Sequence, residues 1–441
     1  MKALRLNNRK RFPWPGLLIL VTGFQLLSAA QVLVRAGDPT WPLVVTLLGY
    51  PVLQWAFIVG LRLATKQDRC ELELLACFLS GIGLTVSASF SADFAWRQGV
   101  AIVGGMVTYI LLRWAIADPD RAMKLRPIVA VGAAGLLAIN LALAQTHFGA
   151  RRWIHLGGFS IQPSELVKIA FIFVGAATLD RLQRTQSITR YLIFSLGCVG
   201  ALFLMSDFGT ALIFFSTFLL IIFLRSADMR ALMLISGAAV LGALLILYFR
   251  PLVAGRFAVY RQVWDYMHEG GFQQTRVLIY SSSGGLFGLG LGNGRLRFIF
   301  AATTDLMFGV IAEEMGLILA FLIPLCYVAM AVYAFRAAQQ ARSSFYAIAA
   351  VSAAGLLVIQ AALNIFGITD LLPLTGVTLP FVSRGGTSMI SVWGLLGFIA
   401  ALRAPPEPKK RKPLPAARPL PKPGDISFAD HAPPRKKPVN R

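Results

Sequence analysis

Long apolar stretches separated by short polar loops recur along the chain from Gly16 to Ala401. A helix needs about 20 mostly apolar residues to cross the hydrocarbon core of a bilayer, so each stretch predicts one membrane span. About twelve spans are expected, at residues 16–36, 42–62, 72–90, 98–117, 127–146, 162–181, 191–205, 209–225, 231–249, 307–334, 345–366 and 385–403. The predicted fold is therefore all-α, a polytopic transmembrane helical bundle.

The composition agrees with a membrane location. Hydrophobic residues make up 56% of the 441 residues, and charged residues make up only 14%. Soluble domains carry about a quarter charged residues, so this chain requires an apolar solvent. The four cysteines have no metal-ligand spacing, and neither a zinc site nor a disulfide framework is predicted.

The positions of lysine and arginine predict the orientation of the bundle. Cytoplasmic loops retain positive charge during insertion, and the basic N-terminus, alternate loops and the tail all fall on one side. With an even number of spans, both termini are expected in the cytoplasm. A large extracellular loop is then expected at about residues 250–305.

The formal net charge of +22 does not indicate a nucleic-acid partner. The basic residues are spread over the expected cytoplasmic loops and the tail without interleaved stacking aromatics. Affinity for anionic lipid head groups explains the charge better, and the membrane is the expected partner. The tail from Ala404 alternates proline with basic clusters and cannot build a core, so it is predicted to be disordered.

Polar clusters near the expected outer ends of the spans are informative, because each costs free energy in a membrane. Arg151, Arg152 and Trp153 precede a helix start, with Gln162 before Pro163 and with Glu165 and Lys168 after it. Because Glu165 and Lys168 share a helix face, they predict either a capped helix with its own ion pair or a cavity that faces substrate. Asp207 likewise either caps the next span or contacts substrate.

The expected extracellular loop has two halves. The first carries Arg256, Arg261, Trp264 and Asp265, and the second is the glycine-rich run 284–294. This run fits neither a dinucleotide fingerprint nor a P-loop, and we expect tight turns with backbone amides open to a phosphate. Beyond the loop, Glu313 and Glu314 point about 100° apart on a helix, so both are not expected to reach one cavity.

These clusters, in this order, resemble the signature blocks of the shape, elongation, division and sporulation (SEDS) family, of the FtsW and RodA type. The resembling blocks are Arg152-Trp153 with Gln162 to Lys168, Asp207 to Thr210, Gly284 to Gly294, Thr304-Asp305 with Ala312 to Leu317, and Leu372 to Gly386. The resemblance implies a ten-span core. The chain would then consist of a basic cytoplasmic N-terminus (1–15), two extra N-terminal spans (16–71), the core (72–403) and a cytoplasmic Pro/Lys/Arg-rich tail (404–441).

The resemblance also implies an activity. A member of this family is expected to be a peptidoglycan glycosyltransferase that joins lipid II units into β-1,4 glycan on the outer face of the bacterial inner membrane and releases undecaprenyl pyrophosphate. The expected partner is a class B penicillin-binding protein, a transpeptidase. Two alternatives stay open, a lipid II flippase and a non-catalytic scaffold for the transpeptidase, as does the choice among division, elongation and sporulation.

By resemblance, Asp265 is the catalytic carboxylate, although an ungapped alignment is shifted by one residue and keeps Glu269 as an alternative base. A hydroxyl that attacks an anomeric carbon needs such a base, and a pyrophosphate leaving group needs cations. The candidate substrate-binding residues are Arg151, Arg152, Trp153, Gln162, Glu165, Lys168, Asp207, Arg256, Arg261, Trp264, Asp305, Ser383 and Arg384. No cofactor is assigned, and assistance by Mg²⁺ or Mn²⁺ stays open.

Besides the segment around Asp265, three positions depart from the family pattern. Thr303 stands where the family usually has histidine, Ser206 where it usually has proline, and Arg384 where it usually has tyrosine. A basic residue at position 384 would add a phosphate contact. These departures bear on the subfamily more than on the reaction.

Overall fold

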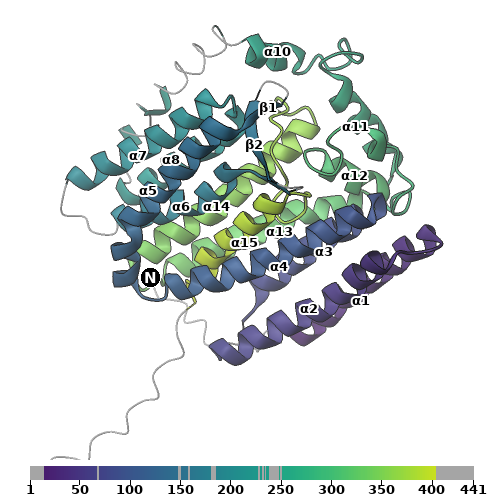
Figure 1. Cartoon of the computed structure of the whole chain (residues 1–441), viewed down its shortest axis with the longest axis horizontal. Helices are drawn as coiled ribbons and strands as arrows, with labels where there is room; N and C mark the ends of the chain where they lie inside the picture. The colour runs from purple at the N-terminus through teal and green to yellow at the C-terminus, as the bar shows by residue number, and fades with distance from the viewer. Residues whose placement is uncertain are drawn as a thin grey trace, which may run out of the picture. The chain divides into compact units, whose positions relative to one another are not determined.

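The computed structural model describes residues 14–66, 69–147, 150–156, 159–179, 185–226, 229–230, 233, 235–237, 248 and 251–403. Helices dominate, as the sequence predicts (Figure 1). The longer helices are α1 (Trp14–Ala36), α2 (Trp41–Thr65), α3 (Glu71–Phe90), α4 (Ala92–Ala115), α5 (Pro119–Leu143), α6 (Pro163–Leu179), α7 (Thr185–Leu204), α8 (Phe208–Ser226), α13 (Leu317–Ala338), α14 (Ser344–Ile368) and α15 (Gly386–Ala400). The shorter ones are α10 (Pro251–Val259), α11 (Phe272–Ser283), the 3-10 turn η1 (Leu296–Phe298) and α12 (Met307–Glu314).

Among the described residues, 8 helices are long and apolar enough to cross a membrane. They are α1 to α5, α8, α13 and α14, and α7 and α15 contribute shorter apolar helices. The chain is therefore a multi-pass membrane protein. The count of about twelve spans stays a prediction, because the expected span at 231–249 lies largely outside the described residues.

One predicted span is divided. The sequence predicted a continuous span over 307–334, but α12 ends at Glu314 and α13 begins at Leu317. Gly316 lies between them with φ +87°, and an added Cβ there would lie 2.3 Å from the carbonyl oxygen of Leu286. The prediction was wrong here because the glycine-rich run crosses the backbone at this point, which apolar length alone does not reveal.

A small antiparallel sheet lies between α5 and α6, and the hydropathy pattern did not predict it. Its strands are β1 (Gln145–His147), β2 (Ala150–Leu156) and β3 (Phe159–Ile161), in the order β1-β2-β3. Thr146 is paired with Arg151, and Ile154 with Ile161. Figure 1 shows the sheet, α11 and α12 toward one end of the long helices. The sheet matters because it sets the position of Arg152 beside the start of α6.

Helix α15 packs against α3, α4, α6 and α14. Its Trp393 is fully buried and meets the rings of Phe57, Tyr109 and Phe381 edge-on, with centroids 5.6, 6.2 and 5.9 Å away. Such edge-to-face aromatic contacts add to the free energy of apolar burial. Gly105 of α4 makes the close packing possible, since a Cβ there would lie 2.9 Å from Trp393 Cγ.

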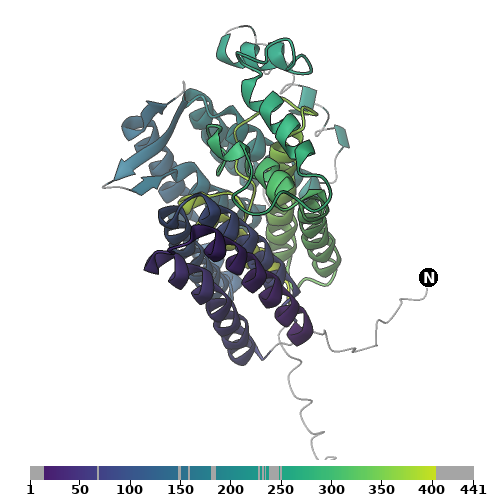
Figure 2. The ribbon, with the colours of Figure 1, turned by 90° about the vertical axis from the view of Figure 1, so that its right-hand side faces the viewer.

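Helices α1 and α2 lie side by side and pack on α3 and α4, as Figures 1 and 2 both show. A buried hydrogen bond of 2.8 Å joins them, from Gln25 Nε2 to Gln54 Oε1. The Tyr50 hydroxyl donates to the Cys77 carbonyl, which attaches α2 to α3 at 2.6 Å. Interhelical hydrogen bonds of this kind stabilise packing inside a membrane, where helices gain little from the hydrophobic effect.

A buried ion pair joins the start of α3 to the residues that follow α15. The Arg403 guanidinium binds both carboxylate oxygens of Glu73, at 2.8 and 2.6 Å, and the Tyr109 hydroxyl also donates to Glu73. Both ionic side chains are almost fully buried. Because a buried charge without its partner is strongly destabilising, this bidentate contact links the two ends of the described core.

Candidate functional site

Three polar side chains from distant parts of the sequence meet where β2, α6 and α8 come together. Arg152 Nε lies 3.3 Å from Asp207 Oδ1, and Gln162 Nε2 donates to Asp207 Oδ2 at 3.4 Å. The Asp207 side chain is only 2% exposed, whereas that of Arg152 is 16% exposed. A buried carboxylate needs such partners, and the partly open guanidinium stays within reach of an anionic ligand.

Asp207 also caps α8. Its Oδ1 accepts a hydrogen bond from the backbone amide of Thr210 at 3.4 Å, and Ser206 before it adopts the left-handed conformation with φ +59°. The left-handed residue turns the chain between α7 and α8 so that the carboxylate points at the helix start. The sequence offered capping and ligand contact as alternatives for Asp207. The structure confirms the cap and also joins it to Arg152.

Asp305 lies close to Gly376, which itself contacts Arg152. Arg152 Nη1 donates to the Gly376 carbonyl at 3.3 Å. Gly376 has φ +69°, and a Cβ added there would lie 3.2 Å from Asp305 Oδ2. Only a glycine therefore fits comfortably between the two side chains. We refer to Arg152, Gln162, Asp207 and Asp305 as the polar cluster.

Glu165 and Lys168 form the intrahelical ion pair that their spacing predicts. Lys168 Nζ lies 2.7 Å from Glu165 Oε1 and donates to Gln360 Oε1 at 2.9 Å. Gln360 in turn donates to the Thr378 carbonyl at 2.9 Å, so the pair joins α6 to α14 and to the loop before α15. Lys168 is only 1% exposed. The pair therefore stabilises the packing of α6 next to the polar cluster. A direct contact of Glu165 or Lys168 with substrate stays a prediction.

The loop before α15 is bound to the segment around Thr304. Ser383 Oγ donates to the Thr304 carbonyl, and Arg384 Nε donates to Thr303 Oγ1 at 3.1 Å. The Arg384 guanidinium also lies 3.8 Å from the centre of the Phe94 ring. Burial lowers the pKa of Arg384, the neighbouring Arg97 lowers it further, and Asp93 partly opposes the shift. An arginine remains charged despite such a shift, so Arg384 places a permanent positive charge here.

Asp265 lies in an exposed segment, residues 260–271, between α10 and α11. This segment is fixed to the end of α14 through Tyr260, whose hydroxyl donates to the Leu371 carbonyl at 2.9 Å, and through Arg261, whose amide donates to Asp370 at 3.3 Å. Trp264 is 54% exposed. Within the described residues, no hydrogen bond or ion pair joins the Asp265 side chain to the polar cluster.

The remaining predicted residues lie around these features. Trp153 is half-buried in β2, where it pairs with Gln145 of β1. Arg151 belongs to β2 and Arg256 to α10, and their side chains lie outside what the structure describes. The structure thus gathers four of the predicted residues into the polar cluster, and it leaves the loop residues apart from it.

The glycine-rich run is bound by the two glutamates of α12. Glu314 accepts hydrogen bonds from the backbone amides of Gly292 and Gly294 at 2.9 and 3.3 Å, and Glu313 accepts one from the amide of Arg295 at 2.6 Å. Two predictions were therefore wrong. These amides are occupied by carboxylates and are not open to a phosphate. Both glutamates serve one loop, because the loop wraps around the helix end and meets both faces.

Comparison with known proteins identifies the family of the chain. The family model for FtsW, RodA and SpoVE, described as "Cell cycle protein", matches residues 74–405. The chain belongs to this family. It is 28% identical to the peptidoglycan glycosyltransferase RodA of Mycobacterium leprae (strain TN) over 389 residues, 81% of this chain and 83% of that protein. It is also 34% identical to the stage V sporulation protein E of Bacillus subtilis (strain 168) over 248 residues, 55% of this chain and 68% of that protein.

Solved structures agree with the FtsW, RodA and SpoVE fold. One, on the structural coordination of polymerization and crosslinking by a peptidoglycan synthase complex, is 25% identical with a TM-score of 0.61, and the match covers 74% of this chain and 95% of that one. The crystal structure of RodA from Thermus thermophilus is 24% identical with a TM-score of 0.54, over 75% of this chain and 94% of that one. The second likeness concerns the fold alone.

In this member of the FtsW, RodA and SpoVE family, two of the departures from the family pattern touch each other. The Arg384 side chain and backbone amide both donate to Thr303, at 3.1 and 2.8 Å. Sequence reasoning named both positions but not their contact, because they are 81 residues apart. It included Gly376 in a block of the resemblance without giving it this role, and it missed the Glu73–Arg403 pair altogether, since that pair belongs to no local pattern.

A glycine substitution tests how tightly the glycine-rich run packs. Gly288 has φ +83°, and a Cβ there would lie 2.3 Å from the Glu314 carbonyl oxygen, whereas Gly285 has φ +56° with nothing within 4 Å. Gly285→Ala is expected to cost only the left-handed conformation, about 1–2 kcal/mol. Gly288→Ala is expected to cost a further ~1–3 kcal/mol because backbone atoms must shift. Equal losses in the two variants, measured by thermal unfolding in detergent, would contradict this packing.

Proposed function

We propose that the chain is a peptidoglycan glycosyltransferase that joins lipid II units into β-1,4 glycan at the outer face of the bacterial inner membrane and releases undecaprenyl pyrophosphate. Membership of the FtsW, RodA and SpoVE family, with relatives named peptidoglycan glycosyltransferase, supports the activity. The single observation that carries the proposal is the buried polar cluster, in which Arg152 contacts Asp207 at 3.3 Å and stays 16% exposed.

The polar cluster suits the departure of a pyrophosphate. The leaving group gains negative charge in the transition state, and a fixed cation that is already in place stabilises it without reorganisation. Arg152 is fixed by Asp207 and by the Gly376 carbonyl. Lys168 belongs to the first turns of the neighbouring helix α6 and keeps that helix in position through Glu165 and Gln360.

The proposal assigns Asp265 as the general base that takes the proton from the attacking sugar hydroxyl. The acid is exposed and follows Trp264, whose exposed ring is suited to stacking on a sugar. We place its catalytic contact in the substrate-bound state, because contacts between a base and its substrate often form only in the complex. The described residues offer no group of three or more metal-binding side chains, so no step is assigned to Mg²⁺ or Mn²⁺.

The orientation and the partner belong to the same proposal. The basic loops support an orientation with both termini in the cytoplasm and the loop at about residues 250–305 outside. A class B penicillin-binding protein is the proposed partner, supported by the likeness to a structure of a peptidoglycan synthase complex, 25% identical to this chain. Helices α1 and α2, which precede the matched residues 74–405, are proposed to be two additions to the family core.

The test is synthesis of glycan by the purified full chain. The protein in lipid vesicles receives fluorescent lipid II, and the products are separated by length and digested with a muramidase. A polymerase gives long products that the muramidase degrades. A flippase moves lipid II across the bilayer without polymer, and a scaffold does neither, so either result would overturn the proposal. A heat-denatured sample controls for spontaneous chemistry and leakage.

A further inference from the structure

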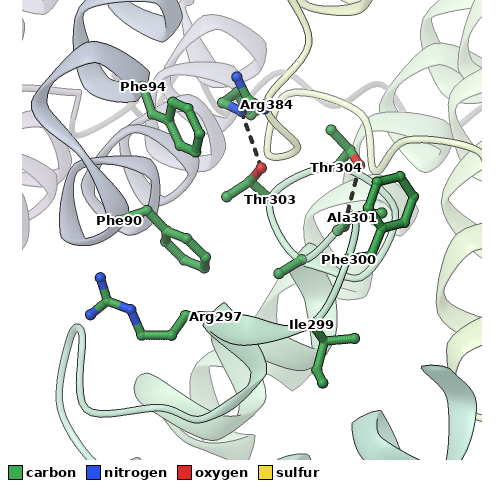
Figure 3. Close-up of a pocket in the computed structure, with 10 residues that line it drawn as sticks. Phe90, Phe94, Arg297, Ile299, Phe300, Ala301, Thr303, Thr304 and Arg384 are labelled. Atoms are coloured by element: carbon green, nitrogen blue, oxygen red, sulfur yellow. Dashed lines mark hydrogen bonds between the residues drawn. The ribbon is translucent and has the colours of Figure 1, made fainter. Parts of the chain in front are cut away.

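A cavity of about 330 Å³ lies beside the polar cluster, between the junction of α3 with α4 and the residues that precede α12. Phe90 comes from the end of α3 and Phe94 from the start of α4. Residues 297–304 line the cavity apart from Phe298, and Arg384 contributes from the loop before α15 (Figure 3). The volume is at the low end of the range of about 300–1,000 Å³ that small-molecule sites occupy. The cavity therefore suits a compact head group better than a disaccharide with its peptide.

The charge of this cavity is positive. Arg297 and Arg384 line it, and no acidic residue does. In the part of the chain that the structure describes, neither arginine has a carboxylate partner: Arg384 donates to Thr303, and Arg297 donates to the Gly292 carbonyl at 2.9 Å. Arg297 and Arg384 are half-buried, and the one acid that acts electrostatically on Arg384 among the described residues, the exposed Asp93, already pairs with Arg97. The two guanidinium groups therefore favour an anion, and phosphate oxygens match their donors.

The rest of the lining is mostly apolar. Phe90, Phe94 and Phe300 present their rings, and Figure 3 shows Phe90 between the two arginines. The arginines also lie over these rings, Arg297 at 5.5 Å from the centre of Phe90 and Arg384 at 3.8 Å from that of Phe94. A ligand that fits must therefore join a charged head to an apolar chain. Free phosphate would leave the aromatic wall unused.

The cavity adjoins the polar cluster through consecutive residues. Thr303 and Thr304 line the cavity, and the next residue, Asp305, lies next to Gly376. The Ser383 hydroxyl holds the Thr304 carbonyl on the other side. Residues 303–305 thus join the polar cluster to the cavity that holds Arg297 and Arg384.

We infer that this cavity binds the diphosphate head and the first isoprene units of a prenyl diphosphate, the lipid carrier that glycosyl transfer releases. The diphosphate lies between Arg297 and Arg384, and the chain lies along Phe90, Phe94 and Phe300. The inference rests on the proposed function, since that reaction is the source of the carrier. It adds a holding site for the released carrier that is separate from the polar cluster.

Binding of farnesyl diphosphate to the purified full chain in zwitterionic nanodiscs tests the inference. Farnesol supplies the chain without charge, inorganic pyrophosphate the charge without a chain, and phosphatidylglycerol a phosphate on a glycerolipid. Arg297→Gln and Arg384→Gln are each expected to weaken farnesyl diphosphate binding about tenfold or more, as the loss of a charge-assisted contact should. Arg295→Gln is the matched control, because this exposed arginine is close in sequence but does not line the cavity.

The outcomes separate the two proposals. Unchanged binding in both cavity variants, with unchanged thermal unfolding, would overturn the inference, as would arginine-dependent binding of phosphatidylglycerol with equal strength. If the wild-type chain polymerises lipid II but binds no farnesyl diphosphate, the inference falls and the proposed function stands. If it binds the diphosphate through both arginines but makes no polymer, the proposed function falls and a lipid diphosphate site remains.

Discussion

Asp207→Asn is expected to lower the rate of glycan synthesis by about 100-fold or more while the bundle stays folded. Asparagine still caps a helix, so α8 keeps its start. It carries no charge, however, and Arg152 loses the carboxylate that lies 3.3 Å away and fixes its guanidinium. The estimate follows the loss of about 10²–10³ in rate when one preorganised charge-stabilising group is removed from an active site. The measurement is the initial rate of fluorescent lipid II consumption.

Two further variants separate charge from folding. Asp207→Ala removes both the cap and the charge, and it is expected to lose an additional ~1 kcal/mol of stability. Asp93→Asn is the matched control for a broken ion pair, since Asp93 pairs with Arg97 at 2.9 Å on the exposed surface of α4. Such exposed pairs contribute only about 0.3–0.5 kcal/mol, so activity should not change. Wild-type synthesis by Asp207→Asn would remove the polar cluster from the mechanism.

The sequence predicted most of the helices because membrane spans follow from apolar length alone. The prediction failed where the helix is interrupted by a contact that is distant in the sequence, because apolar length does not reveal such contacts. Gly316 divides α12 from α13, and its φ of +87° is set by contact with Leu286, 30 residues earlier. The three strands between α5 and α6 were likewise missed, because seven residues or fewer per strand leave no strong alternating pattern.

The sequence predicted individual residues of the candidate site but not how they come together. Spacing alone gave the Glu165–Lys168 pair, which the structure contains at 2.7 Å. The resemblance named Arg152, Gln162 and Asp207, but their meeting point depends on the sheet that turns β2 toward α6. No local pattern predicts that turn.

For the glutamates of α12, the prediction from the helix face was wrong. From their angular separation on the helix, both were not expected to reach one cavity. The glycine-rich run instead wraps the end of the helix, so Gly292 reaches Glu314 and Leu296 reaches Glu313, both at 2.9 Å. Side chains on different faces of a helix reach different partners only when those partners lie along its side. At the end of a helix, one loop can contact both faces.

Asp265→Ala is expected to stop glycan synthesis, with a loss of about 10²–10⁴ in rate for a missing general base. The side chain is exposed and makes no hydrogen bond or ion pair within the described residues, so its removal should leave thermal unfolding unchanged. That combination is the signature of a residue that acts on substrate. Glu269→Ala is the matched control, an exposed carboxylate four residues later in the same segment.

The glycosyltransferase activity and its base are tested most directly by lipid II polymerisation with these two variants beside the wild-type chain, in the same vesicles and at equal protein concentration. We expect long, muramidase-sensitive glycan from the wild type and from Glu269→Ala, and none from Asp265→Ala. Normal polymer from Asp265→Ala together with an inactive Glu269→Ala would contradict the assigned base, and no polymer from the wild type would contradict the activity itself.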